Sequence, residues 1–274
     1  MIFRNKALLL GLSMLILLSM LALFAGFFAP YSPDLMDYRA RMQGPSAQHL
    51  FGTDFFGRDI FSRTLYGTRI AFLVGMLSVS FAVVPGLVLG LLAGYKHGWP
   101  DVVIMHLMDG LLSFPALLLA IAVITVLGPG HFQATISIGI IFLPAFTRLI
   151  RGQVLALREE EYVQAAVALG ASDWRIIFRH LLPNVMGPLI VQTTVSFANA
   201  ILIEAGLSFL GLGTQPPLAS WGAMLQEAKG FMDLQPWAAI LPGLMIAFSV
   251  MGFNLFGDGL RDWLDPRFRP RLMK

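Results

Sequence analysis

The chain has 274 residues, of which 57% are hydrophobic and 13% charged, with no cysteine and a formal net charge of +3. A soluble domain of this size cannot bury so much apolar surface, so we expect the bilayer to be its solvent. The lack of cysteine excludes disulfides and thiolate metal sites. The small net charge gives no reason to expect nucleic acid as a partner.

Six apolar runs approach or reach the roughly 20 helical residues that cross a hydrocarbon core. The first run is longer than the apolar core of a signal peptide and lacks a clean cleavage site, so we expect an uncleaved span. The third run has no sharp N-terminal boundary, and the fourth is short. The prediction is an all-α, polytopic membrane helical bundle with six transmembrane helices, at 7–28, 71–94, 102–127, 132–147, 185–208 and 237–256.

Basic residues predict the orientation, because inner loops of membrane proteins carry an excess of Lys and Arg. With the N-terminus inside, inner segments hold thirteen of the nineteen Lys and Arg residues, and most outer ones fall in one long loop. Both termini and the polar segment 151–184 are therefore expected in the cytoplasm. The inner residues are Arg4, Lys6, Lys96, Arg148, Arg151, Arg158, Arg175, Arg179, Arg261, Arg267, Arg269, Arg271 and Lys274.

The polar segment 151–184 is predicted to form two short helices between two spans. Acidic residues at 159–161 suit the start of the first helix, where they complement the helix dipole, and Gly170 suits its end. We expect Ser172 to cap a second helix over 173–182 that Pro183 ends.

The first of these helices has one narrow apolar face. Tyr162, Ala165, Ala166 and Leu169 recur at spacings of three and four residues, and the two alanines permit close backbone approach. Such a face suits docking into a groove of another protein, and it equally suits a hairpin lying on the membrane surface.

Polar residues within the spans are candidates for a solute path. Gln192, Ser196 and Asn199 share one face of the fifth span and would line a translocation path or act as interhelical glue. Asp109, with His106 one turn earlier, is expected to form a structural ion pair with a nearby Arg, a proton relay being the alternative. Glu204 should lie near the outer surface and be solvated there.

Two further segments suggest structural roles. The second span repeats small residues at Gly86, Gly90 and Gly94, which predicts close helix packing, within the chain or against another subunit. In the outer loop, glycines suit tight turns, and Asp54, Arg58, Asp59 and Arg63 can pair locally. A metal site at His49, Asp54 and Asp59 is the less favoured interpretation of that loop.

The chain lacks the Gly-x-x-x-x-Gly-Lys-Ser/Thr phosphate loop, the His-Glu-x-x-His helix and the Gly-x-Ser-x-Gly elbow. It therefore cannot hydrolyse ATP by the phosphate-loop route, and energy must come from a partner or from an ion gradient. Two alternatives to a partner-driven transporter are a secondary transporter that uses Asp109 and Glu204, and an intramembrane enzyme that uses His106 and Asp109.

The segment 151–184 resembles the EAA loop of permease subunits in binding-protein-dependent ABC importers, through Gln164-Ala165-Ala166-x-x-x-Gly170 and Leu182-Pro183. Gln164 replaces the usual Glu, which excludes a charge-assisted contact there, and His180 replaces the usual aliphatic residue. The resemblance implies a coupling helix that docks on an ATPase subunit. The implied coupling residues are Glu161, Tyr162, Gln164, Ala165, Ala166, Leu169, Gly170, Ser172 and Pro183.

Other motifs resemble the C-type permeases for dipeptides, oligopeptides and nickel. They are Trp221-Gly222, the segments 207–213 and 253–262, and a periplasmic-loop motif that begins at His49 and runs to Arg69. The resemblance covers about residues 30–268. The loop motif includes Gly52, Thr53, Asp54, Gly57, Arg58 and Asp59.

This resemblance implies a non-enzymatic, multi-pass subunit of the bacterial inner membrane with the type I ABC importer permease fold. The implied partners are a homologous B-type permease, two ATP-binding subunits, an extracytoplasmic solute-binding protein and membrane lipid, with no nucleic acid. It implies no cofactor and no metal, because the ATPase subunits use the ATP. The solute would be a di- or oligopeptide or, alternatively, nickel or a metal chelate, and the sequence does not choose between them.

The implied organisation has four parts. Residues 1–30 form the N-terminal tail and first span, and 31–69 form a periplasmic loop. Residues 70–268 form a five-helix core that carries the coupling loop, with the first span packed outside it, and 269–274 form a tail.

Overall fold

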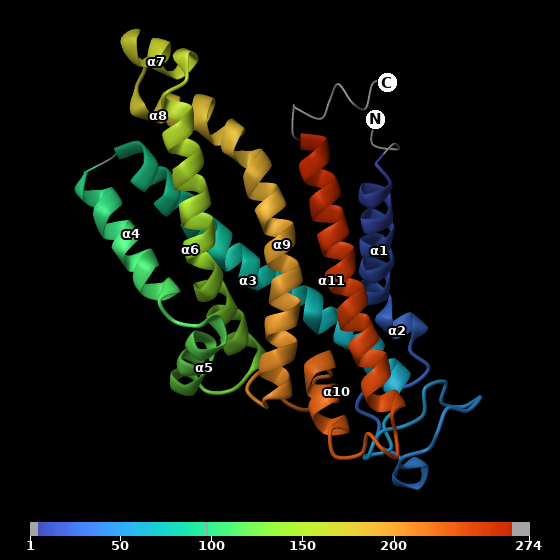
Figure 1. Cartoon of the computed structure of the whole chain (residues 1–274). Coiled ribbons are helices and arrows are strands. Elements are labelled where there is room, and N and C mark those ends of the chain that lie inside the picture. Colours follow the sequence, from blue (N-terminus) through green and yellow to red (C-terminus); the bar gives the residue numbers. More distant parts are fainter. Residues whose placement is uncertain (1–4, 97, 265–274) are drawn as a thin grey trace.

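The computed structural model describes residues 5–96 and 98–264, and it is built of helices joined by loops (Figure 1). The C-terminal tail expected at 269–274 lies outside the described residues. In chain order the helices are α1 Lys6–Leu23, α2 Ala25–Phe28, α3 Ile60–Lys96, α4 Trp99–Leu112, α5 Ala116–Leu127, α6 His131–Arg158, α7 Glu161–Ala168, α8 Asp173–Ile176, α9 Leu182–Phe209, α10 Trp221–Ala228 and α11 Trp237–Leu264, with a short 3₁₀ turn at Tyr38–Ala40 and a π-helical turn at Ile177–Leu181.

Within the described residues, five helices are long and apolar enough to cross a membrane, and a sixth crossing results if α4 and α5 count as one bent span. Figure 1 places the start of α1, the end of α11 and the α7–α8 hairpin at one end of the bundle. The loop 29–59 and α10 lie at the other end. We call these the hairpin end and the loop end.

The second span begins earlier than the sequence pattern predicted, because the loop before it ends at residue 59 and not at 69. Asp59 stands just before α3, and its side chain accepts a hydrogen bond from the backbone N–H of Ser62 at 2.7 Å. This is an N-cap, which satisfies a donor that the first turn leaves free. Helix α3 then continues for 37 residues with Pro85 inside it.

The third predicted span is broken and not straight. Helices α4 and α5 meet at an angle of 93° across the residues before Pro115. Proline has no N–H and disfavours helical geometry in the residue before it, which explains the break at Phe114. Packing does not oppose the break, since α4 buries only Met108 and α5 only Ala120 and Ile124.

Pro183 does not end the second helix of the polar segment, contrary to the prediction. The chain runs from α8 through a π-helical turn directly into α9, with Pro183 in the first turn of α9. The backbone N–H of Leu182 bonds to the carbonyl of Ile177, five residues back. The π-helical turn changes the hydrogen-bond pattern just before Pro183, which has no N–H to donate to a regular α-helical ladder. The fourth span is also longer than expected, since α6 continues to Arg158.

The glycine repeat of the second span packs within the chain. Gly86 lies against Phe146, Gly90 against Ile150 and Gly94 against Val154, all three on α6. The intramolecular interpretation is therefore confirmed. The core cluster beside this seam joins α3, α6 and α9. This cluster holds together the helices that carry the hairpin end and the loop end.

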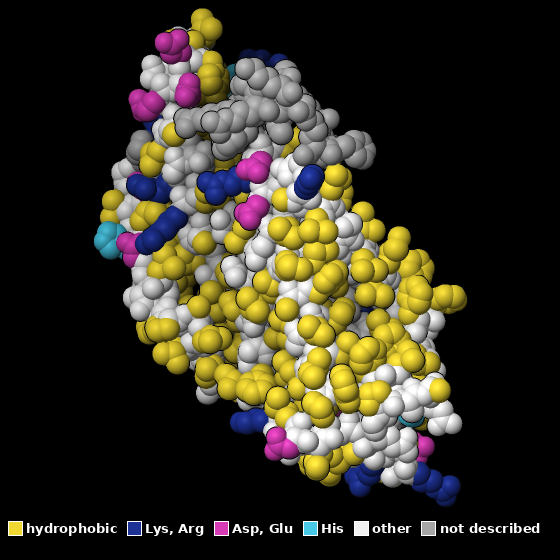
Figure 2. All heavy atoms as spheres, turned by 45° about the vertical axis from the view of Figure 1, so that its right-hand side comes forward, with side chains coloured by type: hydrophobic (Ala, Val, Ile, Leu, Met, Phe, Trp, Pro, Cys, Tyr) yellow, Lys and Arg dark blue, Asp and Glu magenta, His cyan; other side chains and the backbone are white. Residues whose placement is uncertain are grey.

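Helix α1 packs mainly along α11 and so lies at the side of the bundle (Figure 1). Asn5 caps α1 by accepting from the N–H groups of Ala7 and Leu8, and its side-chain amide donates to the carbonyl of Gly259 at 3.4 Å. Figure 2 shows a face on which hydrophobic side chains cover the middle band, while charged side chains gather above and below it. This distribution suits a lipid-facing surface.

Candidate functional sites

The α7–α8 hairpin is held to the bundle by a small apolar seat. Val163 of α7 and Ile176 of α8 are 2% and 1% exposed and belong to the same core cluster as Leu181. Gly170 lies between the two helices with φ at +77°, a conformation that glycine adopts without strain. Ser172 accepts from the N–H of Arg175 at 3.4 Å and caps α8, as the sequence predicted.

The hairpin exposes several apolar side chains. Tyr162, Ala165 and Leu169, three of the four residues of the predicted face, are exposed, with Leu169 at 88%. Ala166 is partly buried. Sequence reasoning missed Trp174 and Phe178, whose rings lie 4.0 Å apart and which are 71% and 45% exposed. Their spacing of four residues was the available signal. Several large apolar side chains exposed on one short hairpin are typical of an interaction surface.

Gln164 bonds to its own chain. Its side-chain amide donates to the backbone carbonyl of Glu159 at 3.3 Å, across the turn between α6 and α7. A glutamate at this position has no N–H to donate, so this contact depends on the glutamine. Glu161 is the first residue of α7 and is exposed. Pro183 lies in the first turn of α9.

The hairpin is also braced against the end of α3, which the sequence pattern did not reveal. Asp173 accepts from the Tyr95 hydroxyl at 2.7 Å and pairs with Lys96 at 3.0 Å. Arg158 at the end of α6 donates to the carbonyls of Gly94 and Tyr95. The hairpin and the end of α6 therefore both contact the C-terminal end of α3.

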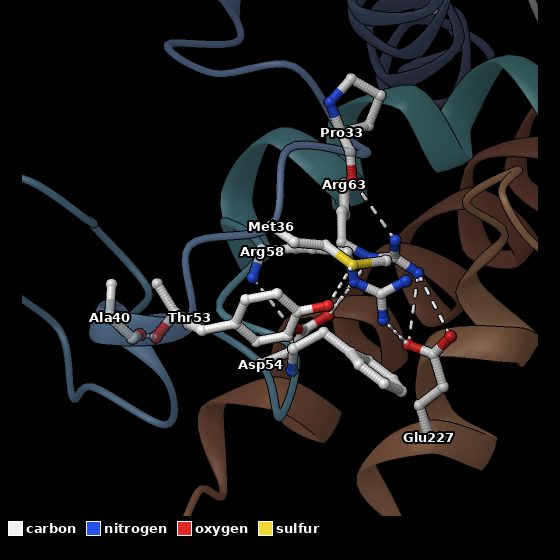
Figure 3. Close-up of polar contacts among 10 residues, drawn as sticks. Pro33, Met36, Ala40, Thr53, Asp54, Arg58, Arg63 and Glu227 are labelled. Carbon is white, nitrogen blue, oxygen red and sulfur yellow. Dashed lines mark hydrogen bonds and ion pairs between the residues drawn. The ribbon is translucent and has the colours of Figure 1, made fainter.

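At the loop end, two buried arginines share two carboxylates (Figure 3). Arg58 Nε lies 2.6 Å from Asp54 Oδ2, and its Nη2 lies 2.6 Å from Glu227 Oε2. Arg63 Nη2 lies 3.2 Å from the same Glu227 oxygen. We call Asp54, Arg58, Arg63 and Glu227 the loop cluster. Local pairing was predicted, but Glu227 comes from α10 and was not.

The glycines and threonine of the loop motif shape the backbone around this cluster. Gly52 and Gly57 have φ of +75° and +77°. A side chain at Gly57 would collide with the backbone of Asp37, so the position requires glycine on two counts. The Thr53 hydroxyl accepts from the N–H of Gln43 at 2.9 Å and donates to the carbonyl of Ala40.

The residues considered for a metal site have other partners. His49 Nδ1 lies 2.9 Å from Asp59 Oδ1, and Asp54 belongs to the loop cluster. In the part of the chain that the structure describes, no group of three or more His, Asp or Glu side chains could hold a metal ion.

Comparison with known proteins decides the family. Residues 86–270, more than half of the chain, match the family described as binding-protein-dependent transport system inner membrane component. The chain belongs to this family. Residues 1–45 match a second family, the N-terminal transmembrane domain of oligopeptide transport permease C. The chain is thus a transport permease subunit of an ABC importer and not an enzyme.

Individual relatives cover nearly all of this permease. It is 46% identical to the dipeptide transport system permease protein of Alkalihalophilus pseudofirmus, over 97% of this chain and 88% of the relative. It is 45% identical to the glutathione transport system permease protein of Pectobacterium atrosepticum, over 94% and 86%. A chain of the MetNI methionine ABC transporter has the same fold, with a TM-score of 0.62 at 17% identity over 74% of this chain and 96% of that one.

Two of the three polar residues predicted to share a face of α9 contact one another. Gln192 donates to the Ser196 hydroxyl at 3.3 Å, so these two side chains contact one another. Ser196 is buried, whereas Asn199 is exposed. Gln192 and Ser196 therefore bond within their own helix. A role of the three residues in translocation stays a prediction.

The ionisable residues of the spans have structural partners. Asp109 pairs with Arg148 of α6, the ion pair that the sequence led us to expect. His106 bonds instead to the backbone carbonyl of Val102 at 2.6 Å. Glu204 is not solvated, contrary to the prediction, since it is 2% exposed and accepts from the hydroxyls of Ser208 and Thr214 at 2.7 and 3.0 Å. The loop after α9 folds back over the end of the helix and covers it.

Proposed function

We propose that this permease imports di- or oligopeptides and that its α7–α8 hairpin transmits the ATP cycle of a separate ATPase subunit. The observation that carries the coupling role is the exposed apolar surface of a hairpin braced against α3. The peptide class is supported by relatives named for dipeptide and glutathione transport that align over almost the whole chain.

We further propose an orientation with the hairpin end in the cytoplasm, so that both termini are cytoplasmic and the loop end faces outward. The basic residues Lys96, Arg151 and Arg158 at the hairpin end support this choice. The proposed complex contains a homologous B-type permease, two ATP-binding subunits and an extracytoplasmic solute-binding protein. Gln192, Ser196 and Asn199 would line its path.

A docking test follows from the exposed position of Ala165. Replacing Ala165 with Trp should abolish co-purification of the ATPase subunits with the permease, because the bulky ring blocks close approach of α7. Ala47→Trp makes the same change at an exposed site in the outer loop and should leave co-purification intact. Retention of the ATPase by the Ala165→Trp variant would contradict the docking role.

Gly170 offers a test of coupling that is separate from docking. In the described structure, a Cβ at Gly170 has no atom within 4 Å, so Gly170→Val acts only through the positive φ, at a cost of about 1 kcal/mol. We expect several-fold less solute uptake per ATP hydrolysed, measured in proteoliposomes. Asparagine tolerates this conformation, so Gly170→Asn should retain more coupling than the valine variant. Gly152→Val, at another uncrowded but helical glycine, is the control. Normal uptake by Gly170→Val would refute the assignment.

A further inference from the structure

An open groove of about 530 Å³ lies between the end of α1 and the first half of α3, at the side of the bundle (Figure 1). Its walls are Ser19, Ala22, Leu23, Arg69 and Phe72. Helix α1 has 18 residues, so its length of about 27 Å is close to the ~30 Å thickness of a hydrocarbon core. The groove at its C-terminal end therefore lies at the depth where lipid headgroups begin.

Arg69 brings a positive charge to this groove. Its Nε donates to the carbonyl of Ala22 at 2.7 Å and its Nη2 to the carbonyl of Leu23 at 3.1 Å. The guanidinium carbon lies 4.9 Å from the centre of the Tyr66 ring. Arg69 is exposed, and it forms no ion pair with a carboxylate in the part of the chain that the structure describes. A guanidinium has five N–H groups, so the two carbonyls hold the side chain in place and leave donors for an acceptor from outside the chain.

An apolar stripe on α3 begins one turn beyond Arg69 and leads into the membrane. Phe72, Leu73 and Met76 follow Arg69 at intervals of three, four and seven residues, which places them on the same helix face. Leu73 is 45% exposed and Met76 is 65% exposed. Because α3 begins at the loop end, this face carries a cation at the membrane edge and apolar side chains at greater depth. A phospholipid has the matching order of phosphate first and acyl chains below.

We propose that this groove binds an anionic phospholipid, whose phosphate accepts hydrogen bonds from Arg69. One acyl chain lies along Phe72, Leu73 and Met76. Arginine binds phosphate oxygens through charge-assisted hydrogen bonds. The site favours a lipid with a net negative charge over a zwitterionic one, because no described carboxylate pairs with Arg69. This lipid site depends neither on the transported solute nor on which side of the membrane the loop end faces.

The test uses the lack of cysteine in the chain, because one introduced thiol can carry a single reporter. In the Met76→Cys variant, a fluorophore on the thiol lies on the face of α3 where the acyl chain is placed. The full chain is reconstituted in phosphatidylcholine bilayers with increasing amounts of phosphatidylglycerol whose brominated chains quench the fluorophore. The same titration with brominated phosphatidylcholine is the reference. We expect phosphatidylglycerol to bind about fivefold more tightly at this position.

Two arginine variants separate the groove from the overall charge of the molecule. Arg69→Gln should abolish the preference for phosphatidylglycerol, because glutamine keeps a donor but loses the charge. Arg39 is also exposed, lies in the loop 29–59 and does not line the groove. Arg39→Gln makes the same change in net charge and should leave the fivefold preference intact. A reporter in Val126→Cys, at an 85% exposed site of α5, should show no preference between the two lipids.

A variant that keeps Arg69 guards against damage to the end of α1. Ser19 lines the groove, and its hydroxyl donates within α1 to the carbonyl of Leu15. Ser19→Glu places a carboxylate in the groove and leaves the contacts of Arg69 with α1 available. This variant should also abolish the preference for phosphatidylglycerol, so the proposal remains testable if Arg69→Gln does not fold.

Three results would overturn the proposal. The first is equal binding of the two lipids at the Met76→Cys reporter. The second is an equal loss of preference in Arg69→Gln and Arg39→Gln, which would show that only the overall charge attracts the lipid. The third is displacement of phosphatidylglycerol by millimolar glycerol phosphate, which carries the phosphate without acyl chains and would identify a site for a soluble phosphate instead.

Discussion

Replacing Gly90 with leucine should destabilise this permease by about 3 kcal/mol or more and prevent correct assembly of the bundle. A Cβ at Gly90 would lie 2.6 Å from the Ile150 Cβ and 2.7 Å from the Thr147 carbonyl oxygen. Neither atom is the end of a flexible side chain, so α3 and α6 must separate. Overpacking of a tight core costs about 1–3 kcal/mol even where side chains can adjust. The free energy of unfolding in mixed micelles is the measurement.

The matched control for Gly90 is Gly110 of α4. In the described structure, a Cβ at Gly110 meets nothing within 4 Å, so Gly110→Leu makes the same chemical change without a collision. We expect it to be nearly neutral. Equal stability of the Gly90 and Gly110 variants would show that α3 and α6 are not in contact at this seam.

Replacing Glu227 with leucine should cost about 3–5 kcal/mol, because it leaves two buried arginines sharing the single carboxylate of Asp54. The side chains of Arg58 and Arg63 are only 4% and 2% exposed, so little of either guanidinium meets water that could replace the lost carboxylate. We expect the loop 29–59 to detach from α10. Faster proteolysis of the loop, together with a lower midpoint of chemical unfolding, would report it.

Two comparisons show whether charge or packing is responsible. Glu227→Gln keeps an acceptor but removes the charge, so it should cost less than the leucine variant. The exposed pair between Lys96 and Asp173, at 55% and 60% exposure, should contribute under about 1 kcal/mol when Lys96 is replaced by Met. Similar losses for Lys96→Met and Glu227→Leu would contradict a special role for burial.

The sequence predicted those parts of the fold that depend on spacing along one segment. Glycines four residues apart at 86, 90 and 94 form a stripe that admits a neighbouring backbone, and α6 packs there. The alternating charges of the outer loop indicated ion pairs because Asp54 and Arg58 are close in the chain. Long apolar runs likewise predicted the helical bundle.

Features that depend on distant or competing contacts could not be predicted. Glu227 is 169 positions from Arg58, and its own neighbours in the chain carry no hint of a buried role. A proline in an apolar run did not show whether the helix breaks there. Four prolines lie inside continuous helices, namely Pro85, Pro144, Pro188 and Pro242. Only Pro115 marks a sharp bend among the described spans. What distinguishes it is the scarcity of buried residues in α4 and α5, which local sequence does not reveal.

The candidate coupling surface was predicted in position but not in full. Tyr162, Ala165 and Leu169 were found from their helical spacing, whereas Trp174 and Phe178 were assigned to a helix without a surface role. The bracing of Asp173 by Tyr95 and Lys96 joins residues more than 75 positions apart. Such a contact follows from how α3 and α6 pack, and that packing appears only in three dimensions.

The pairing of α1 with α11 joins the first and the last of the described helices. Gly11 touches the backbone of Phe256, Gly259 touches that of Leu8, and the bond from Asn5 to Gly259 spans 254 residues. Because the N-terminal part of a chain is made first, α1 is synthesised long before the helix that covers this backbone seam. A chain interrupted before residue 237 leaves the seam open, so α1 reaches its final packing only after α11 is made.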